Sequence, residues 1–306
     1  MNTSMRWKKL GLVFCPSGEF EWMHSHAAVP IAESLGKNLF KIYFSSRDKD
    51  NKSFTCYVVI DIEHPNKLLD LSTKPVMVPG GLGEFDDSGA MGTWLTTYKG
   101  KDFLYYAGWN LGVTVPFRNS IGLYTRTNGG EFTRHSSGPI VDRSMYEPHF
   151  CGSCAVLPSE DFWRMWYLSC TGWQMRDGKP QHRYHLKYAE SLDGVIWQRN
   201  GVVAIDFANE HEYAISRPSV IRDSDRWRMW YSFRGQSYRI GYAESDDGRQ
   251  WTRLDSKAGI DVSATGWDSD MIEYPFVFDH GNQRYMLYNG NGYGITGFGL
   301  AVLEKH

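Results

Sequence analysis

The sequence predicts an all-β protein, a five-bladed β-propeller with four antiparallel strands in each blade. Three observations predict this fold. The pentapeptide WRMWY occurs twice, at 163–167 and at 227–231. Each copy precedes a second near-repeat, LKYAESLDGVIW from Leu186 and IGYAESDDGRQW from Ile240. Aromatic segments of the same kind recur along the whole chain, and repetition at a fixed period is typical of propellers and other repeat folds.

The aromatic segments are expected to form the second strand of each unit. They end at Phe44, Tyr106, Tyr167, Tyr231 and Tyr288, so the intervals are 62, 61, 64 and 57 residues. Aromatic side chains suit the pleated, half-buried surface of a strand. Five units of roughly sixty residues therefore fill the chain.

Each unit places an apolar segment before the aromatic strand and another strand-like segment after it. The first segments are AAVPIA, MGTWL, CAVL, PSVI and PFVF, and the third are CYVVIDI, IGLYTRT, LKYAES, IGYAES and FGLAVLE. The third and fourth strands are expected to join through tight turns at Asn128-Gly129, Asp193-Gly194 and Asp247-Gly248, dipeptides that two-residue hairpins favour. No segment of a dozen residues has a helical period.

The last unit provides three strands, and the N-terminal segment KKLGLVF is expected to add its outer strand and close the ring. Radial closure of this kind protects the edges of the sheets. The prediction is a single domain over residues 1–306.

Composition narrows the class of protein. Lys and Arg number 33 against 35 Asp and Glu, so a net charge of −2 gives no electrostatic reason to expect a nucleic acid or an anionic membrane as partner. Apolar runs are strand-sized, and the N-terminus lacks the apolar region of a signal peptide. Five irregularly spaced cysteines then indicate free thiols in the cytoplasm. The oligomeric state stays open.

Function is expected where the units differ, at the segments that precede each first strand and face the central funnel. All five segments carry acidic residues: Glu21, Glu84, Asp86, Asp87, Glu147, Glu210, Glu212, Asp268, Asp270 and Glu273. Converging carboxylates in an aromatic-walled site suit glycoside chemistry, which needs one protonated acid and one carboxylate base or nucleophile. A single carboxylate of this kind more often solvates a loop or caps a turn, but the recurrence in every unit favours function.

Metal binding and cofactor binding are weaker hypotheses. His24 and His26 could hold a metal, but no partner pair is evident by spacing, so hydrogen bonding to substrate is favoured. Cys151 and Cys154 with His149 make half of a zinc site, and packing of an inner strand explains the thiols. The glycine-rich segments do not open helices, so no phosphate loop is predicted. No metal and no cofactor are expected.

Several long phrases resemble a known group of proteins. They include HSHAAVP, IYFSSRDKDN, FDDSGAMG, YAISRPSV, GWDSDMIEYPFVF and YMLYNGNGYGITGFGLAV. The chain is similar to the family-43 and family-32 glycoside hydrolase superfamily of five-bladed propellers. More closely, it resembles a branch whose members are often encoded among bacterial surface-polysaccharide biosynthesis genes.

The resemblance implies a base or nucleophile Asp on blade one, a supporting Asp on blade three and an acid Glu on blade four. Glu147 and Glu212 match the last two places by position, whereas blade one carries His24-Ser25-His26 instead of an acid. Asp86 or Asp87 on blade two would then substitute.

The first hypothesis is a carbohydrate-active enzyme that cleaves or transfers a glycosidic bond. Glu212 would be the general acid, Asp87 or Asp86 the base or nucleophile, and Glu147 a modulator of their pKa values. The predicted substrate-binding residues are His24, His26, Arg47, Trp109, Asn110, Trp173, Arg217, Arg234, Asp270, Glu273 and Asn289. The three arginines would bind an anionic part of the substrate. Two alternatives stay open: a biosynthetic enzyme acting on a nucleotide-linked sugar, and a sugar-binding propeller without catalysis.

Overall fold

The computed structural model describes residues 5–304, which are almost entirely β-strand and turn. The all-β prediction is confirmed. The strands are β1 (Trp7–Phe14), β2 (Ser25–Gly36), β3 (Leu39–Arg47), β4 (Ser53–Asp61), β5 (Leu68–Leu71), β6 (Gly89–Tyr98), β7 (Lys101–Leu111), β8 (Phe117–Thr127), β9 (Thr133–Arg134), β10 (Cys151–Leu157), β11 (Trp163–Arg176), β12 (Lys179–Ser191), β13 (Val203–Ile205), β14 (Ala214–Arg222), β15 (Trp227–Arg234), β16 (Tyr238–Ser245), β17 (Thr252–Arg253), β18 (Glu273–His280), β19 (Gln283–Asn289) and β20 (Phe298–Leu303). Two short helical segments are η1 (Asp255–Lys257) and α1 (Asn291–Gly294).

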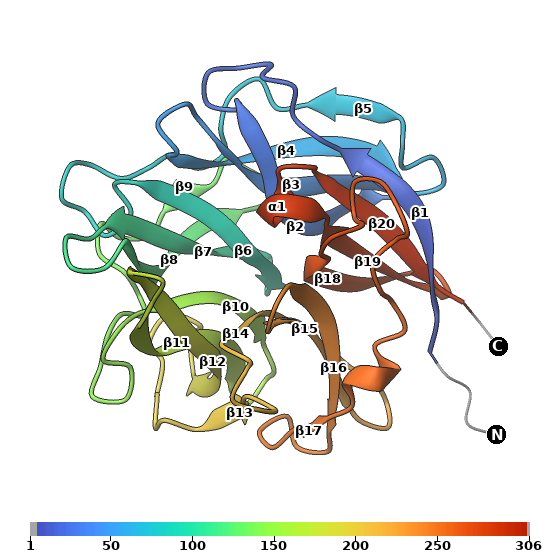
Figure 1. The fold of residues 1–306 in the computed structure, drawn as a ribbon. Coiled ribbons are helices and arrows are strands. Elements are labelled where there is room, and N and C mark those ends of the chain that lie inside the picture. Colours follow the sequence, from blue (N-terminus) through green and yellow to red (C-terminus); the bar gives the residue numbers. More distant parts are fainter. Residues whose placement is uncertain (1–4, 305–306) are drawn as a thin grey trace.

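The strands pair with their sequence neighbours in antiparallel groups. Group 1 is β2–β5, group 2 is β6–β9, group 3 is β10–β13, group 4 is β14–β17, and group 5 is β18–β20 together with β1. Groups 1 and 2 are joined by one parallel pair, Ser53 with Gly89, and groups 3 and 4 by Tyr184 with Ala214. Figure 1 shows the groups arranged around a common centre, with β1 running beside β20.

The first strand of each group lies at the centre, where β2, β6, β10, β14 and β18 contact one another in turn and β18 contacts β2 again. Arg217 of β14 crosses this centre. Its fully buried guanidinium donates hydrogen bonds to the carbonyl of Pro30 at 2.9 Å and to that of Thr93, and it lies 5.7 Å from the ring centroid of Phe276. One side chain therefore ties together the first strands of four groups.

The repeated phrases of the sequence have a structural role between groups. The turns Asp193-Gly194 and Asp247-Gly248 place their glycines at φ 74° and 75°, a region that favours glycine. The expectation of two-residue hairpins is wrong, because residues 192–202 separate β12 from β13 and residues 246–251 separate β16 from β17. The Gly194 carbonyl accepts a hydrogen bond from Tyr105 of group 2 at 2.8 Å. The Gly248 carbonyl likewise accepts one from Trp166 of group 3 at 2.7 Å. The turn of each repeat thus fastens its group to the preceding one.

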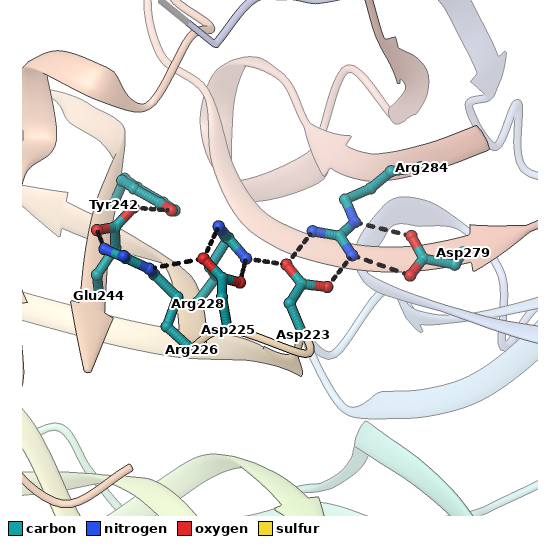
Figure 2. A network of polar contacts seen from close by, with 8 residues as sticks. All are labelled: Asp223, Asp225, Arg226, Arg228, Tyr242, Glu244, Asp279 and Arg284. Carbon is teal, nitrogen blue, oxygen red and sulfur yellow. Dashed lines mark hydrogen bonds and ion pairs between the residues drawn. The ribbon is translucent and has the colours of Figure 1, made fainter. Parts of the chain in front are cut away.

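A second fastening lies at the end of β14 remote from Ala214 (Figure 2). Arg284 of β19 donates to Asp223 at 2.7 Å and to Asp279 at 2.7 Å, and Arg228 also binds Asp223. These ion pairs connect the β14–β15 hairpin with the β18–β19 hairpin. Every arginine of the network pairs with a carboxylate of the protein, which explains the network as a support of the fold. None of the helical segments in residues 5–304 has the length and apolar character needed to cross a bilayer.

Candidate functional site

Three of the carboxylates that precede the first strands are held in a repeated cluster with a tyrosine and a cation. Tyr106, Tyr167 and Tyr288 lie on β7, β11 and β19, the second strands of groups 2, 3 and 5. They donate their hydroxyls to Asp86 at 2.8 Å, to Glu147 at 3.0 Å and to Asp268 at 3.1 Å. A cation from the outer part of the same group completes each cluster: Arg134 on Asp86, Arg199 and Lys187 on Glu147, and Lys9 on Asp268.

Group 4 varies this arrangement by using two carboxylates. Arg253 of β17 donates Nη1 to Glu212 Oε2 at 2.7 Å and Nη2 to Oε1 at 3.0 Å. Tyr231 donates its hydroxyl to Asp255, which also pairs with Arg253. The backbone N–H of Ala208 donates to Glu212 at 2.8 Å. Both oxygens of Glu212 are therefore occupied by groups of the protein itself.

Three residues that the sequence predicted to be catalytic, Asp86, Glu147 and Glu212, belong to these clusters and hold strands together. Asp86 and Glu147 are fully buried and Glu212 is 5% exposed. The sequence contained a signal for the clusters, because the cation follows an aromatic residue by two positions in Phe132-Thr-Arg134, Trp197-Gln-Arg199 and Trp251-Thr-Arg253. A carboxylate and an Arg repeating in the same register indicate a pair.

A different set of residues gathers at the end of the inner strands where β14 and β18 begin. We call it the face cluster, and it consists of Arg47 of β3, Tyr184 of β12, Tyr213, Arg234 of β15, Tyr238 of β16, Glu273 and Tyr274 of β18, and Tyr293 of α1. It draws on groups 1, 3, 4 and 5. The rings of Tyr238 and Tyr274 lie 6.2 Å apart, those of Tyr238 and Tyr293 6.0 Å apart, and Tyr184 and Tyr238 share a hydrogen bond of 2.6 Å between their hydroxyls.

Glu273 is the distinctive member of the face cluster. It is fully buried, and neither carboxylate oxygen has a well-formed hydrogen bond to any residue in the range 5–304. Burial raises the pKa of Glu273 well above its usual range, and the nearby Arg234 charge and the Tyr293 backbone N–H only partly oppose this. Burial therefore favours the protonated form of Glu273, and a protonated carboxyl group suits a proton donor.

Two arginines accompany this acid without a carboxylate partner among the described residues. Arg234 lies over the rings of Tyr213, Tyr238 and Tyr293, between 5.4 and 5.7 Å from their centroids, and donates to the Tyr293 hydroxyl. Arg47 lies close enough to His26 and Tyr274 to affect their ionisation. Unpaired guanidinium groups in an aromatic setting suit carboxylate or phosphate ligands.

Further aromatic residues extend the face cluster toward groups 2 and 3. His182 stacks on Tyr184 at 4.6 Å, and its ring lies 5.8 Å from that of Trp173. Trp173 in turn lies 5.5 Å from Phe117. Burial and the Arg234 charge lower the pKa of His182 to about 4, so this imidazole is neutral. The result is a continuous aromatic wall on which sugar rings could stack.

The structure separates the other predicted substrate-binding residues. Trp109 lies against Gly89 at the start of β6 and donates to Ser53 at 3.1 Å. Asp87 is half-buried, and among residues 5–304 its carboxylate accepts hydrogen bonds from Gly83 and Ser88 alone. Asn110 is half-buried near the end of β7, whereas His24 and Asp270 are exposed. His26 is buried, and burial followed by the Arg47 charge lowers its pKa to about 4.

Two predicted residues are enclosed by the fold. Asn289 is fully buried, accepts from the Val29 backbone at 2.8 Å and donates to the Ala27 carbonyl at 2.6 Å. Arg217 is fully buried at the centre, where it binds backbone carbonyls. Sequence reasoning missed Tyr184, Tyr238 and Tyr293, because tyrosines of repeated strands look like core residues. Tyr293 lies in the irregular segment NGNGYG, which was a usable signal.

Metal ligands do not converge in the part of the chain that the structure describes, since no group of three or more His, Cys, Asp and Glu side chains could hold an ion. Cys151 and Cys154 are buried, and burial raises the pKa values of both thiols, that of Cys154 to about 12.

Comparison with known proteins places the chain in a family. No protein-family model matches it. Two Mycobacterium tuberculosis proteins, "Uncharacterized protein Rv1502" of strain H37Rv and "Uncharacterized protein MT1551" of strain CDC 1551, are each 45% identical over 98% of this chain and 100% of their own length. The chain belongs to the family of these mycobacterial proteins.

Solved structures establish its fold class. A glycosyl hydrolase from Bacteroides ovatus matches with a TM-score of 0.74 and 14% identity, covering 98% of this chain and 94% of that one. A thermostable family-43 glycoside hydrolase matches with a TM-score of 0.63 and 14% identity, covering 92% of this chain and 88% of that one. The family therefore has the fold of the glycoside hydrolase-like propellers, as the sequence resemblance predicted.

Proposed function

We propose that the chain is a single five-bladed propeller in which groups 1–5 are the blades and β1 closes the ring as the outer strand of the last blade. The antiparallel pairing of β1 with β20 supports this, as does the cyclic contact among the five first strands. The face cluster then lies at the mouth of the central funnel, where propellers bind ligands.

We further propose that the protein is a carbohydrate-active enzyme that cleaves or transfers a glycosidic bond at the face cluster. One observation carries this proposal: neither oxygen of the buried Glu273 carboxyl group has a well-formed hydrogen bond to any residue in the range 5–304, and burial favours its protonated form in a cluster that also holds two arginines without a carboxylate partner in that range and a wall of aromatic rings. A structural carboxylate would be paired, as Asp86, Glu147 and Glu212 are. Perturbed acids of this kind concentrate at functional sites.

Glu273 would act as the general acid that protonates the leaving oxygen. Asp87 of group 2, which has no cation partner among the described residues, stays the candidate base or nucleophile from the sequence, although it is not a member of the face cluster. Arg47 and Arg234 would bind an anionic group of the substrate. The Tyr293 backbone lies beside the acid, so α1 would move when substrate enters. Glu147 and Glu212 hold the blades rather than the substrate in this proposal.

A thermal-shift screen against acidic oligosaccharides, neutral glycosides and nucleotide sugars tests binding, because a ligand of the folded state raises the melting temperature. Turnover of each stabilising compound is then compared between wild type, Glu273→Gln and Glu212→Gln. We expect Glu273→Gln to bind the compound and to lose about 100-fold or more in kcat. Full turnover by Glu273→Gln would refute the assignment of the acid.

The two arginines favour one alternative, a biosynthetic enzyme of surface polysaccharide that acts on a nucleotide-linked sugar. Their guanidinium groups would then bind the diphosphate. Stabilisation by nucleotide sugars, with none by oligosaccharides, would support this alternative. Binding without turnover of any compound would instead support a sugar-binding propeller.

A further inference from the structure

The β11–β12 hairpin is longer than its counterpart in the next group. β11 and β12 contain 14 and 13 residues, whereas β15 and β16 contain 8 each. We call the outer part of this hairpin, residues 171–184, the arm. Its partner strand β13 ends at Ile205, so the arm extends past it, and the chain at 206–207 runs beside the arm instead of pairing with it.

A pocket of about 480 Å³ lies between the arm and this segment. Its walls are Thr171, Gly172, Trp173, Gln174, Arg183, His185, Asp206 and Phe207. Side chains alternate across a strand, so Arg183 and His185 lie on the opposite side of β12 from His182 and Tyr184 of the aromatic wall. We call it the outer pocket, and it is distinct from the face cluster.

The polar side chains of the outer pocket are held in place by packing, but some of their hydrogen-bonding atoms have no partner among residues 5–304. The Arg183 guanidinium lies 4.2 Å from the ring centroid of Phe207, and it has no ion pair or side-chain hydrogen bond with any residue in the range 5–304. His185 is 7% exposed, and its Nδ1 lies 3.0 Å from Asp206 Oδ1. Its Nε2 is buried and has no partner in the same range.

The protonation states of His185 and Asp206 determine which ligand groups the outer pocket could bind. Burial lowers the pKa of His185 despite the nearby Asp206, so the ring is neutral at neutral pH. Asp206 calls for the proton on Nδ1, which leaves Nε2 as an acceptor. Burial acts against ionisation of Asp206, but the hydrogen bonds from His185 and from the Phe207 backbone N–H, together with the nearby Arg183 charge, outweigh it and lower the pKa of the carboxyl. The pocket thus offers one cationic donor, Arg183, and two acceptors, Nε2 and the Asp206 carboxylate.

We propose that the outer pocket binds an acidic sugar residue, with its carboxylate or phosphate on Arg183 and its hydroxyls on Asp206 and His185. A simple anion lacks the hydroxyl donors and would be repelled by Asp206, whereas a neutral sugar leaves Arg183 unpaired. Phe207 provides apolar surface for the sugar ring, whereas the Trp173 ring packs on the other side of the arm against Phe117 and His182. The inference rests on the proposed function in taking the ligand to be carbohydrate, and it extends the substrate class to a chain of sugars that reaches across the arm.

Isothermal titration calorimetry of the full chain tests the proposal with four probes: a galacturonate tetrasaccharide, glucuronate, glucose 6-phosphate and neutral glucose. The tetrasaccharide and at least one of the two acidic monosaccharides should bind. Glucose should bind at least tenfold more weakly. The preference between glucuronate and glucose 6-phosphate then shows whether the pocket selects a carboxylate or a phosphate. Arg183→Met retains the stem over Phe207 and should weaken the acidic probes about tenfold or more. Phe207→Leu should also weaken them, while Arg176→Met on the same arm should not. Unchanged melting temperatures show that each variant is folded.

The outcomes separate this inference from the proposed function. Unchanged affinity of Arg183→Met, equal affinity for glucose, or no binding of any acidic probe by the wild type overturns the outer pocket. Loss of binding in Arg234→Met with none in Arg183→Met would place the acidic sugar at the face cluster alone. Retained binding in Arg234→Met and Glu273→Gln, with loss in Arg183→Met, supports the outer pocket even if no turnover is ever found.

Discussion

Arg253 binds Glu212 at two points, with nitrogen–oxygen distances of 2.7 and 3.0 Å. This pair belongs to a set in which groups 2 to 5 each hold a carboxylate between an inner and an outer strand. Carboxylates that precede an inner strand need not face the funnel. In this chain they clamp the sheet.

Breaking that clamp should reduce stability more than it alters chemistry. Arg253→Met leaves Glu212 buried without its cation, and we expect a loss of about 2–4 kcal/mol in the free energy of unfolding. Urea unfolding of the variant and the wild type measures this loss in the free energy of unfolding. Glu210→Gln, at a side chain that is 88% exposed, is the matched control and should change little. A loss below about 0.5 kcal/mol in Arg253→Met would show that the pair is incidental.

The centre of the fold should depend on Arg217. Arg217→Ala removes two hydrogen bonds to buried carbonyls and leaves a cavity, so we expect a loss of about 3–5 kcal/mol. The exposed Arg222 at the end of the same strand is the control, and its replacement by Ala should have an effect below about 1 kcal/mol. Equal stability of both variants would mean that the centre does not need the guanidinium.

Glu273 should make the protein less stable as the pH rises. Its pKa is raised in the folded chain above the ordinary value of 4.5. Between that value and the folded pKa the unfolded chain releases a proton that the folded chain keeps, so stability falls with increasing pH, by at most about 1.4 kcal/mol per pH unit. Glu273→Gln removes this pH-dependent contribution to stability. The melting temperature of the variant minus that of the wild type should grow from pH 5 to pH 8, and a constant difference would mean that Glu273 is ionised normally.

His26 should have the opposite effect on the acid side. Its pKa falls from 6.5 to about 4 on folding. Stability from the neutral imidazole is complete above about pH 6.5 and is lost as the pH decreases toward 4, because the unfolded chain then binds a proton that the folded one does not. His26→Asn suits the φ of 62° at this position. Its melting temperature should decline less than that of the wild type between pH 7 and pH 5. The exposed His24, replaced by Asn, is the control and should follow the wild type.

Much of the fold was predictable from the sequence because its signals are local. The spacing of aromatic strands and the glycines of the Asp-Gly turns are set by strand geometry and by backbone conformation near each residue. The pairing of a carboxylate with a cation two residues after Phe132, Trp197 or Trp251 was also accessible, although the carboxylates alone suggested catalysis.

The sequence by itself determined the repeated β-units, and with them the fold class, because strand period and turn chemistry act over a few residues. Only the tertiary structure decided which of the buried acidic side chains in residues 5–304 lacks a partner. Glu212 lies two residues before the inner strand β14, and Glu273 is the first residue of the inner strand β18, so the two occupy similar positions in their sequence repeats. Their difference arises because Arg253 reaches Glu212, whereas the groups around Glu273 come from four separate parts of the chain and bury it without pairing it.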